Sequence, residues 1–97
     1  MELDHIRAED FEAHLGKGLE LRAATTALEL ELVALHRLPA HGMRAQPPFS
    51  LTLRGGRDVV LGQGMVVLAH PALGPLEVFL VPIGPDARGM RYEITFN

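Results

Sequence analysis

Hydrophobic and polar residues alternate most regularly near the carboxyl end of the chain, where Met90–Asn97 follows a strict period of two. This period predicts a strand with one buried and one solvent-facing side. The buried side carries Met90, Tyr92, Ile94 and Phe96. The preceding segment, Leu76–Ile83, is apolar at nearly every position, so we expect it to be covered on both faces. With the turn residues Gly84–Gly89 between them, the two segments predict a β-hairpin.

Short strands are also predicted upstream of this hairpin, because Phe49–Arg54 alternates cleanly and Met65–His70 is largely apolar. A third short apolar segment, Val59–Leu61, is a further candidate strand. The segment Ala27–His36 is ambiguous, since its Ala, Leu and Glu residues favour a helix while its leucines recur at every second position. We favour a strand there, with a helix as the alternative.

A short helix is predicted over Ala8–Leu15, with acidic residues in its first turn and Gly16 as its left-handed stop. Phe11 and Leu15 lie four residues apart and would share one face of it. Because so short a helix is unstable alone, we expect it to pack on Leu76–Ile83.

These elements predict a single domain, residues 1–97, that is mainly β with one short N-terminal helix. The expected architecture is a small antiparallel barrel or rolled sheet of six to seven strands that ends in the C-terminal hairpin. The longest loop is Pro39–Pro48, whose prolines oppose both helix and strand pairing.

Composition narrows the function classes. The 9 basic and 12 acidic residues give a net charge of −3, and aromatic residues make up 5% of the chain, which argues against nucleic-acid binding. The chain has no cysteine, so it forms neither disulfides nor thiolate metal sites. Its start resembles no signal peptide and no apolar run approaches the ~20 residues of a membrane helix, so we expect a cytoplasmic protein with no membrane contact.

Candidate chemistry is sparse. The only serine, Ser50, lies in an alternating strand without the glycines of a nucleophile elbow. The five histidines do not follow metal-ligand spacing, and we expect no metal or other cofactor. His70, just before Pro71, is expected to bind turn backbone through its ring nitrogens. Glu29 and Glu31 lie on the solvent side of their strand, which does not raise a carboxyl pKa for acid–base catalysis. No catalytic residue is therefore assigned.

An alternative function remains open, namely a small-molecule-binding barrel or an unrecognised hydrolase. In that case His70, Tyr92 and Glu93 would lie near the mouth of the barrel.

A partner surface is the main functional expectation. Pro82 removes one backbone donor from Leu76–Ile83, so this strand either borders the sheet or carries a bulge. An apolar strand at a sheet border invites a protein partner or a second copy of the chain, although the N-terminal helix could cover it instead. The Pro39–Pro48 loop is the second candidate surface. The proposed contact residues are Leu76, Val78, Phe79, Val81, Pro82, His41, Met43 and Arg44.

Three segments stand out, namely His70-Pro71-Ala72-Leu73-Gly74, Phe79-Leu80-Val81-Pro82-Ile83-Gly84-Pro85-Asp86, and Tyr92-Glu93 to Phe96-Asn97. In these segments the chain resembles an uncharacterised family of small bacterial proteins, and His70–Gly74 and Phe79–Pro82 are the most specific parts of the resemblance. Proteins of this kind are often encoded beside phage tail-collar-like proteins, so the resemblance implies a part in a phage-tail-like assembly. Our leading hypothesis is a non-enzymatic structural or interaction protein that acts through sheet-edge and loop surfaces.

Overall fold

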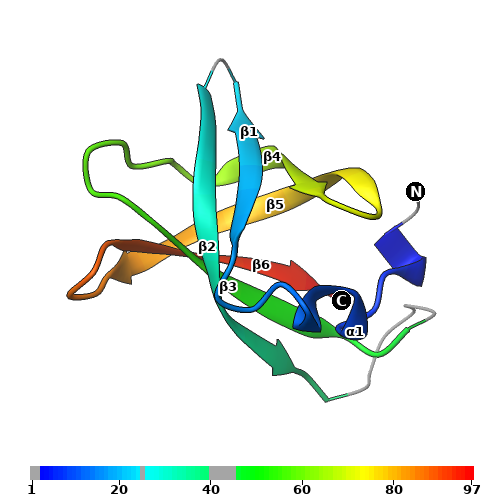
Figure 1. Ribbon diagram of the computed structural model, residues 1–97. Coiled ribbons are helices and arrows are strands. Elements are labelled where there is room, and N and C mark those ends of the chain that lie inside the picture. The colour runs from blue at the N-terminus through cyan, green and yellow to red at the C-terminus, as the bar shows by residue number, and fades with distance from the viewer. Residues whose placement is uncertain (1–2, 25, 40–45) are drawn as a thin grey trace.

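The computed structural model describes residues 3–24, 26–39 and 46–97 (Figure 1). A 3₁₀ turn at Leu3–His5 and the helix α1, Glu9–Glu12, precede the strands. The strands are β1 Gly18–Ala23, β2 Thr26–Arg37, β3 Phe49–Gly55, β4 Gly64–His70, β5 Gly74–Pro85 and β6 Met90–Phe96. In the described part of the chain these six antiparallel strands form a closed barrel in the order β1-β2-β3-β6-β5-β4. The mainly β fold class is confirmed.

The barrel closes where β1 pairs with β4, through Glu20–Ala69, Leu21–Leu68 and Arg22–Val67. The strand that contains Leu76–Ile83 therefore does not border an open sheet, because β5 pairs with β4 on one side and with β6 on the other. The expected sheet edge is wrong at this strand. The bulge is confirmed, since the register of β5 against β6 shifts between Pro82 and Gly84.

The barrel consists of two halves with the same pattern of strand pairing, and each half contains one long strand, β2 or β5. β2 pairs with β1 along its first part and with β3 along its second part, and β5 pairs in the same way with β4 and then with β6. We call residues 18–55 the first half and residues 64–96 the second half. The registers agree in three cross-strand pairs of each half. Leu21–Leu28 corresponds to Leu68–Leu76, Leu19–Leu30 to Val66–Val78, and Leu32–Leu53 to Leu80–Ile94.

Alternating side chains of every strand fill the interior, as in other barrels with few strands. In β2, Leu30 and Leu32 are buried, so the strand favoured for Ala27–His36 is confirmed. In β6, Tyr92, Ile94 and Phe96 are buried and Met90 is half-buried against them. The C-terminal hairpin is thus confirmed.

The expectation that Leu76–Ile83 is covered on both faces is wrong. β5 alternates, with Leu76, Val78 and Leu80 in the interior while Glu77 and Phe79 are exposed. The physical reason is that a single closed sheet has one interior, which receives only every second side chain. An apolar run of this length does not by itself reveal which of its two faces is covered.

The helix is shorter than predicted, and it closes one end of the barrel rather than covering β5 (Figure 1). The Phe11 ring is fully buried, with its centroid 6.0 Å from that of Phe49 and 5.8 Å from that of Phe96. Leu15 is exposed and does not share the buried face of Phe11. Gly16 has the predicted left-handed conformation, at φ +82°, but it lies four residues beyond the end of α1, so it is not the stop of this helix.

The segment Val59–Leu61 is not a strand, and it lies in the connection from β3 to β4. Leu61 packs against the core, and its N–H donates to the buried Tyr92 Oη at 2.9 Å. Val59 and Val60 are exposed beside it. One hydrogen bond to a core tyrosine therefore anchors this loop to the barrel.

Candidate contact face on the outside of the barrel

His70 lies at the end of the barrel that α1 closes, and its ring is fully engaged with backbone. Nδ1 accepts from the N–H groups of Ala72 and Leu73 at 3.0 and 3.1 Å. Because both partners are donors, Nδ1 carries no proton, and Nε2–H donates to the Asp10 carbonyl at 2.6 Å. The predicted role of His70 in binding turn backbone is confirmed. The ring also ties the β4–β5 turn to α1.

His14 packs edge-on against this histidine, with the ring centroids of His14 and His70 4.8 Å apart. Desolvation lowers the pKa of His14, and the neighbouring His70 and Lys17 lower it further. In residues 3–24, 26–39 and 46–97, no three His, Asp or Glu side chains are grouped so as to hold a metal ion.

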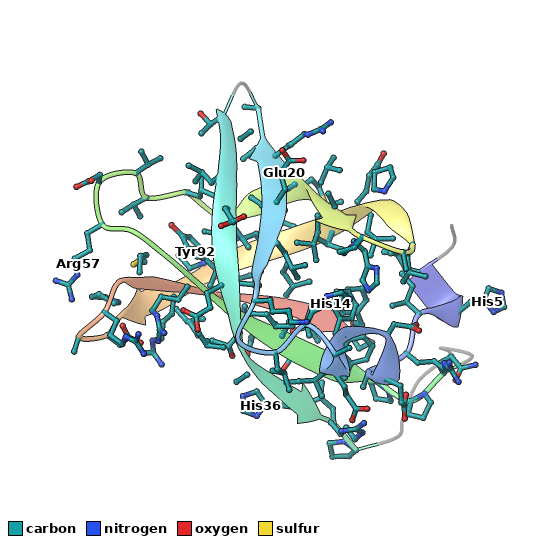
Figure 2. All side chains as sticks on the ribbon, in the orientation of Figure 1. His5, His14, Glu20, His36, Arg57 and Tyr92 are labelled. Carbon is teal, nitrogen blue, oxygen red and sulfur yellow. The ribbon has the colours of Figure 1, made fainter. Side chains whose placement is uncertain are left out.

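The three residues proposed for a barrel mouth are not brought together. His70 packs against Phe11 at the α1 end, whereas Tyr92 bonds to Leu61. Glu93 alternates with the buried Tyr92 and lies on the outer side of β6. Figure 2 shows Tyr92 well separated from His14, which marks the α1 end.

Away from α1, a cluster of ion pairs around Arg54 connects β2, β3 and the β5–β6 turn. Arg54 of β3 binds Asp86 at 3.0 Å and Glu31 at 3.2 Å, so it joins the β5–β6 turn to β2. Asp86 also accepts from the N–H groups of Arg88 and Gly89, and Arg57 donates to its carbonyl. The Arg88 N–H, and after it the Arg54 guanidinium, lower the pKa of the Asp86 carboxyl. The side chains of Arg54, Asp86 and Glu31 are thus paired with one another, which favours a structural role for this cluster.

The largest exposed apolar side chains on the strands form a cross-strand pair on the outside of β4 and β5. Met65 and Phe79 face each other in register and are 61% and 47% exposed. Val67 lies two residues along β4 and Val81 two residues along β5, and both are half-buried. We call Met65, Val67, Phe79 and Val81 the β4–β5 face. Exposed apolar side chains gathered on one face make that face a candidate contact site.

Charged residues flank the β4–β5 face on the neighbouring strands. On the β1 side Arg22 is in register with Val67, and on the β6 side Glu93 is in register with Val81. Hollows lie on both sides of the Met65–Phe79 pair. The first is lined by Arg22, Ala24, Met65, Val66, Val67 and Glu77. The second is lined by Leu3, Met65, Glu77, Val78, Phe79, Thr95, Phe96 and Asn97.

The predicted contact residues therefore do not lie together on one surface. Leu76 and Val78 lie in the barrel interior, where no partner reaches them, because their side of β5 faces inward. Phe79 is exposed, and Val81 and Pro82 are half-buried. The remaining three, His41, Met43 and Arg44, lie outside the described residues.

Sequence reasoning missed Met65 and Val67 as surface residues. Once Met65–His70 is a strand, the buried Val66 and Leu68 place Met65 and Val67 on the opposite face. The signal was therefore the period of two within an apolar strand.

Comparison with known proteins identifies the family. Residues 6–96 match the model of a domain of unknown function, DUF6916. The chain belongs to this family. No curated protein and no solved structure matches the chain. No helix of the described residues is long and apolar enough to cross a membrane.

Proposed function

We propose that this protein is a non-enzymatic structural or interaction protein that binds a protein partner through the β4–β5 face. The observation that carries the proposal is the exposed Met65–Phe79 pair at the centre of that face. Burial of apolar surface is the main favourable term in protein association, and aromatic residues and methionine are enriched at interfaces.

The surroundings of the pair support the same function. Arg22 and Glu93 give the apolar centre a polar border, which is the usual anatomy of a protein–protein interface. Away from this face, Arg54 is engaged in ion pairs with Asp86 and Glu31 of its own chain. The resemblance to proteins encoded beside tail-collar-like proteins supports a phage-tail-like assembly as the setting.

Photo-cross-linking in cells that produce the protein tests this proposal. A photoreactive phenylalanine at position 79 should give a discrete covalent adduct with a protein. The same residue at position 29 is the matched control, because Glu29 is exposed on the outer side of β2.

The proposal fails if position 79 gives no adduct beyond those formed from position 29. A reproducible small-molecule ligand in a thermal-shift screen, together with no adduct at position 79, would favour the alternative of a ligand-binding barrel.

A further inference from the structure

His70 connects the β4–β5 turn to α1 through both nitrogens of a buried ring, which is 4% exposed. Nδ1 accepts from the N–H groups of Ala72 and Leu73, and Nε2–H donates to the Asp10 carbonyl. This arrangement requires a neutral ring, because a proton on Nδ1 would point at two N–H donors and remove both bonds to the turn. A charged His70 therefore does not connect the turn to α1.

The neighbours of the ring also oppose a positive charge. His14, just after α1, packs edge-on against His70 with the ring centroids 4.8 Å apart, and the Phe11 ring packs edge-on at 5.0 Å. Desolvation lowers the pKa of His14, and His70 and Lys17 lower it further. A proton on His70 would thus add charge beside His14 and Lys17 and against an apolar ring.

No described carboxylate compensates for such a charge. In residues 3–24, 26–39 and 46–97, neither His14 nor His70 forms an ion pair. The β4–β5 turn, residues 71–73, contains no titratable side chain. The surroundings therefore favour the neutral ring. The acids of α1 and β1 are paired elsewhere, namely Asp10 with Arg7, Glu9 and Glu12 with Arg37, and Glu20, opposite Ala69, with Arg22.

The other main contacts of α1 are one buried ring and exposed ion pairs. With four residues, α1 has no stability of its own. The Phe11 ring packs against Phe49 and Phe96 at the barrel end, while the ion pair of Arg37 with Glu12 is exposed and contributes little. The strand pairings that close the barrel include no residue of α1. The barrel can therefore stay closed around its strands when α1 leaves its end (Figure 1).

We propose that His70 makes α1 an acid-sensitive closure of the barrel end, in which the neutral ring holds α1 and a proton on the ring releases it. Release uncovers Phe11, Phe49 and Phe96. In the open form the ring lies in water, where histidine has an ordinary pKa of about 6.5. Because the closed form binds fewer protons, closure is most stable above about pH 6.5 and is lost as the pH falls below it. This device does not depend on the proposed function of the β4–β5 face.

Hydrogen exchange of the purified full-length protein, measured by NMR from about pH 7.5 to about pH 5, tests the closure. The amides of Phe11 and His14 donate to carbonyls of the same segment, so they report release of α1. After correction for the intrinsic pH dependence of exchange, their opening constant should rise about tenfold per pH unit below about pH 6. The amides of β4 and β5 should stay protected, which distinguishes release of α1 from unfolding of the barrel.

His70→Asn tests the part played by the ring. The Asn side-chain oxygen lies as many bonds from the backbone as Nδ1, so it can still accept from the turn, but it does not titrate. This variant should lose most of the pH dependence of α1 opening. His36→Asn is the matched control, because His36 is exposed on β2, and this variant should keep the wild-type dependence.

Nitrogen NMR of the wild-type ring tests the proposal without a variant. At about pH 7.5, Nε2 of His70 should carry the proton and Nδ1 should not. Four outcomes overturn the proposal. They are a protonated Nδ1 at neutral pH, an α1 opening constant that does not rise in acid, the same rise in His70→Asn as in the wild type, and loss of protection in β4 and β5 together with α1.

Discussion

On the outside of the barrel, Gly18 and Glu31 face each other across β1 and β2. By the shared register of the two halves, Met65 and Phe79 take the equivalent positions across β4 and β5. In the first pair Gly18 has no side chain, and the charged Glu31 binds Arg54 of its own chain. The second pair is apolar and exposed. The equivalent positions of the two halves thus differ in chemistry, because Glu31 is charged where Phe79 is apolar.

The same contrast continues at the neighbouring outer positions. The Glu20–Glu29 pair of the first half corresponds to Val67–Glu77 of the second half. The interiors agree, because leucine occupies both equivalent positions at the centre of the long strands, Leu32 and Leu80. Folding requires apolar side chains in the interior of both halves. Because the outer residues differ between the halves, we infer that the apolar outer side chains of β4 and β5 serve a requirement other than folding.

Core truncations in equivalent positions should have the largest effect. Leu32→Ala and Leu80→Ala each remove a fully buried side chain from the middle of a long strand, and each should cost about 2–5 kcal/mol of unfolding free energy. Urea denaturation measures both. A cost at one position several times that at the other would break the equivalence of the two interiors.

The connections differ between the halves, and the short β5–β6 turn should be sensitive to added volume. A Cβ at Gly89 would overlap the Gly55 carbonyl oxygen, whereas a Cβ at Gly56 meets nothing within 4 Å. We expect Gly89→Ala to destabilise by about 1–3 kcal/mol, as overpacking does. Gly56→Ala is the control and should stay within about 0.5 kcal/mol. Equal urea midpoints for the two variants would contradict the close packing of this turn.

Asp86 in the same turn should make part of the free energy of unfolding depend on pH. The Arg88 N–H and the Arg54 guanidinium lower the pKa of Asp86 below its ordinary 3.8 in the folded state. A carboxyl of this kind contributes stability above the unfolded pKa, and the contribution is lost as the pH falls through the folded pKa. Asp86→Asn should therefore reduce the acid-induced loss of stability below about pH 4. Identical pH profiles for wild type and variant would contradict this.

Phe79→Glu, which installs the residue of the first half at the equivalent position, should have the smallest effect on stability. Phe79 is exposed on its own chain, so in dilute purified protein, where no partner covers it, the urea midpoint should change by an amount equivalent to less than about 0.5 kcal/mol. A loss above about 1 kcal/mol would mean that Phe79 serves the fold rather than a partner.

The sequence predicted the elements whose pattern is local. The period of two in Met90–Phe96 and the leucines of β2 place the correct side chains inside. The β1–β4 pairing that closes the barrel joins residues nearly fifty positions apart, and no local pattern encodes it. The position of Phe11 at the barrel end follows from that closure, so it was not predictable from the helix alone.

The candidate site was predicted only in part, for a related reason. Phe79 and Val81 were proposed as contact residues, but an apolar run does not show which face of β5 is inside, so Leu76 and Val78 were included with them. Met65 joins the site only through its register with Phe79, which is a tertiary fact.

Hydroxyl-radical footprinting in the producing cells, compared with dilute purified protein, tests the central claim most directly. Met65 and Phe79 should be labelled strongly in the dilute protein and be protected in the cell, while the exposed Val59 and Val60 are labelled alike in both. Equal labelling of Met65 and Phe79 in the two conditions would contradict a covered β4–β5 face.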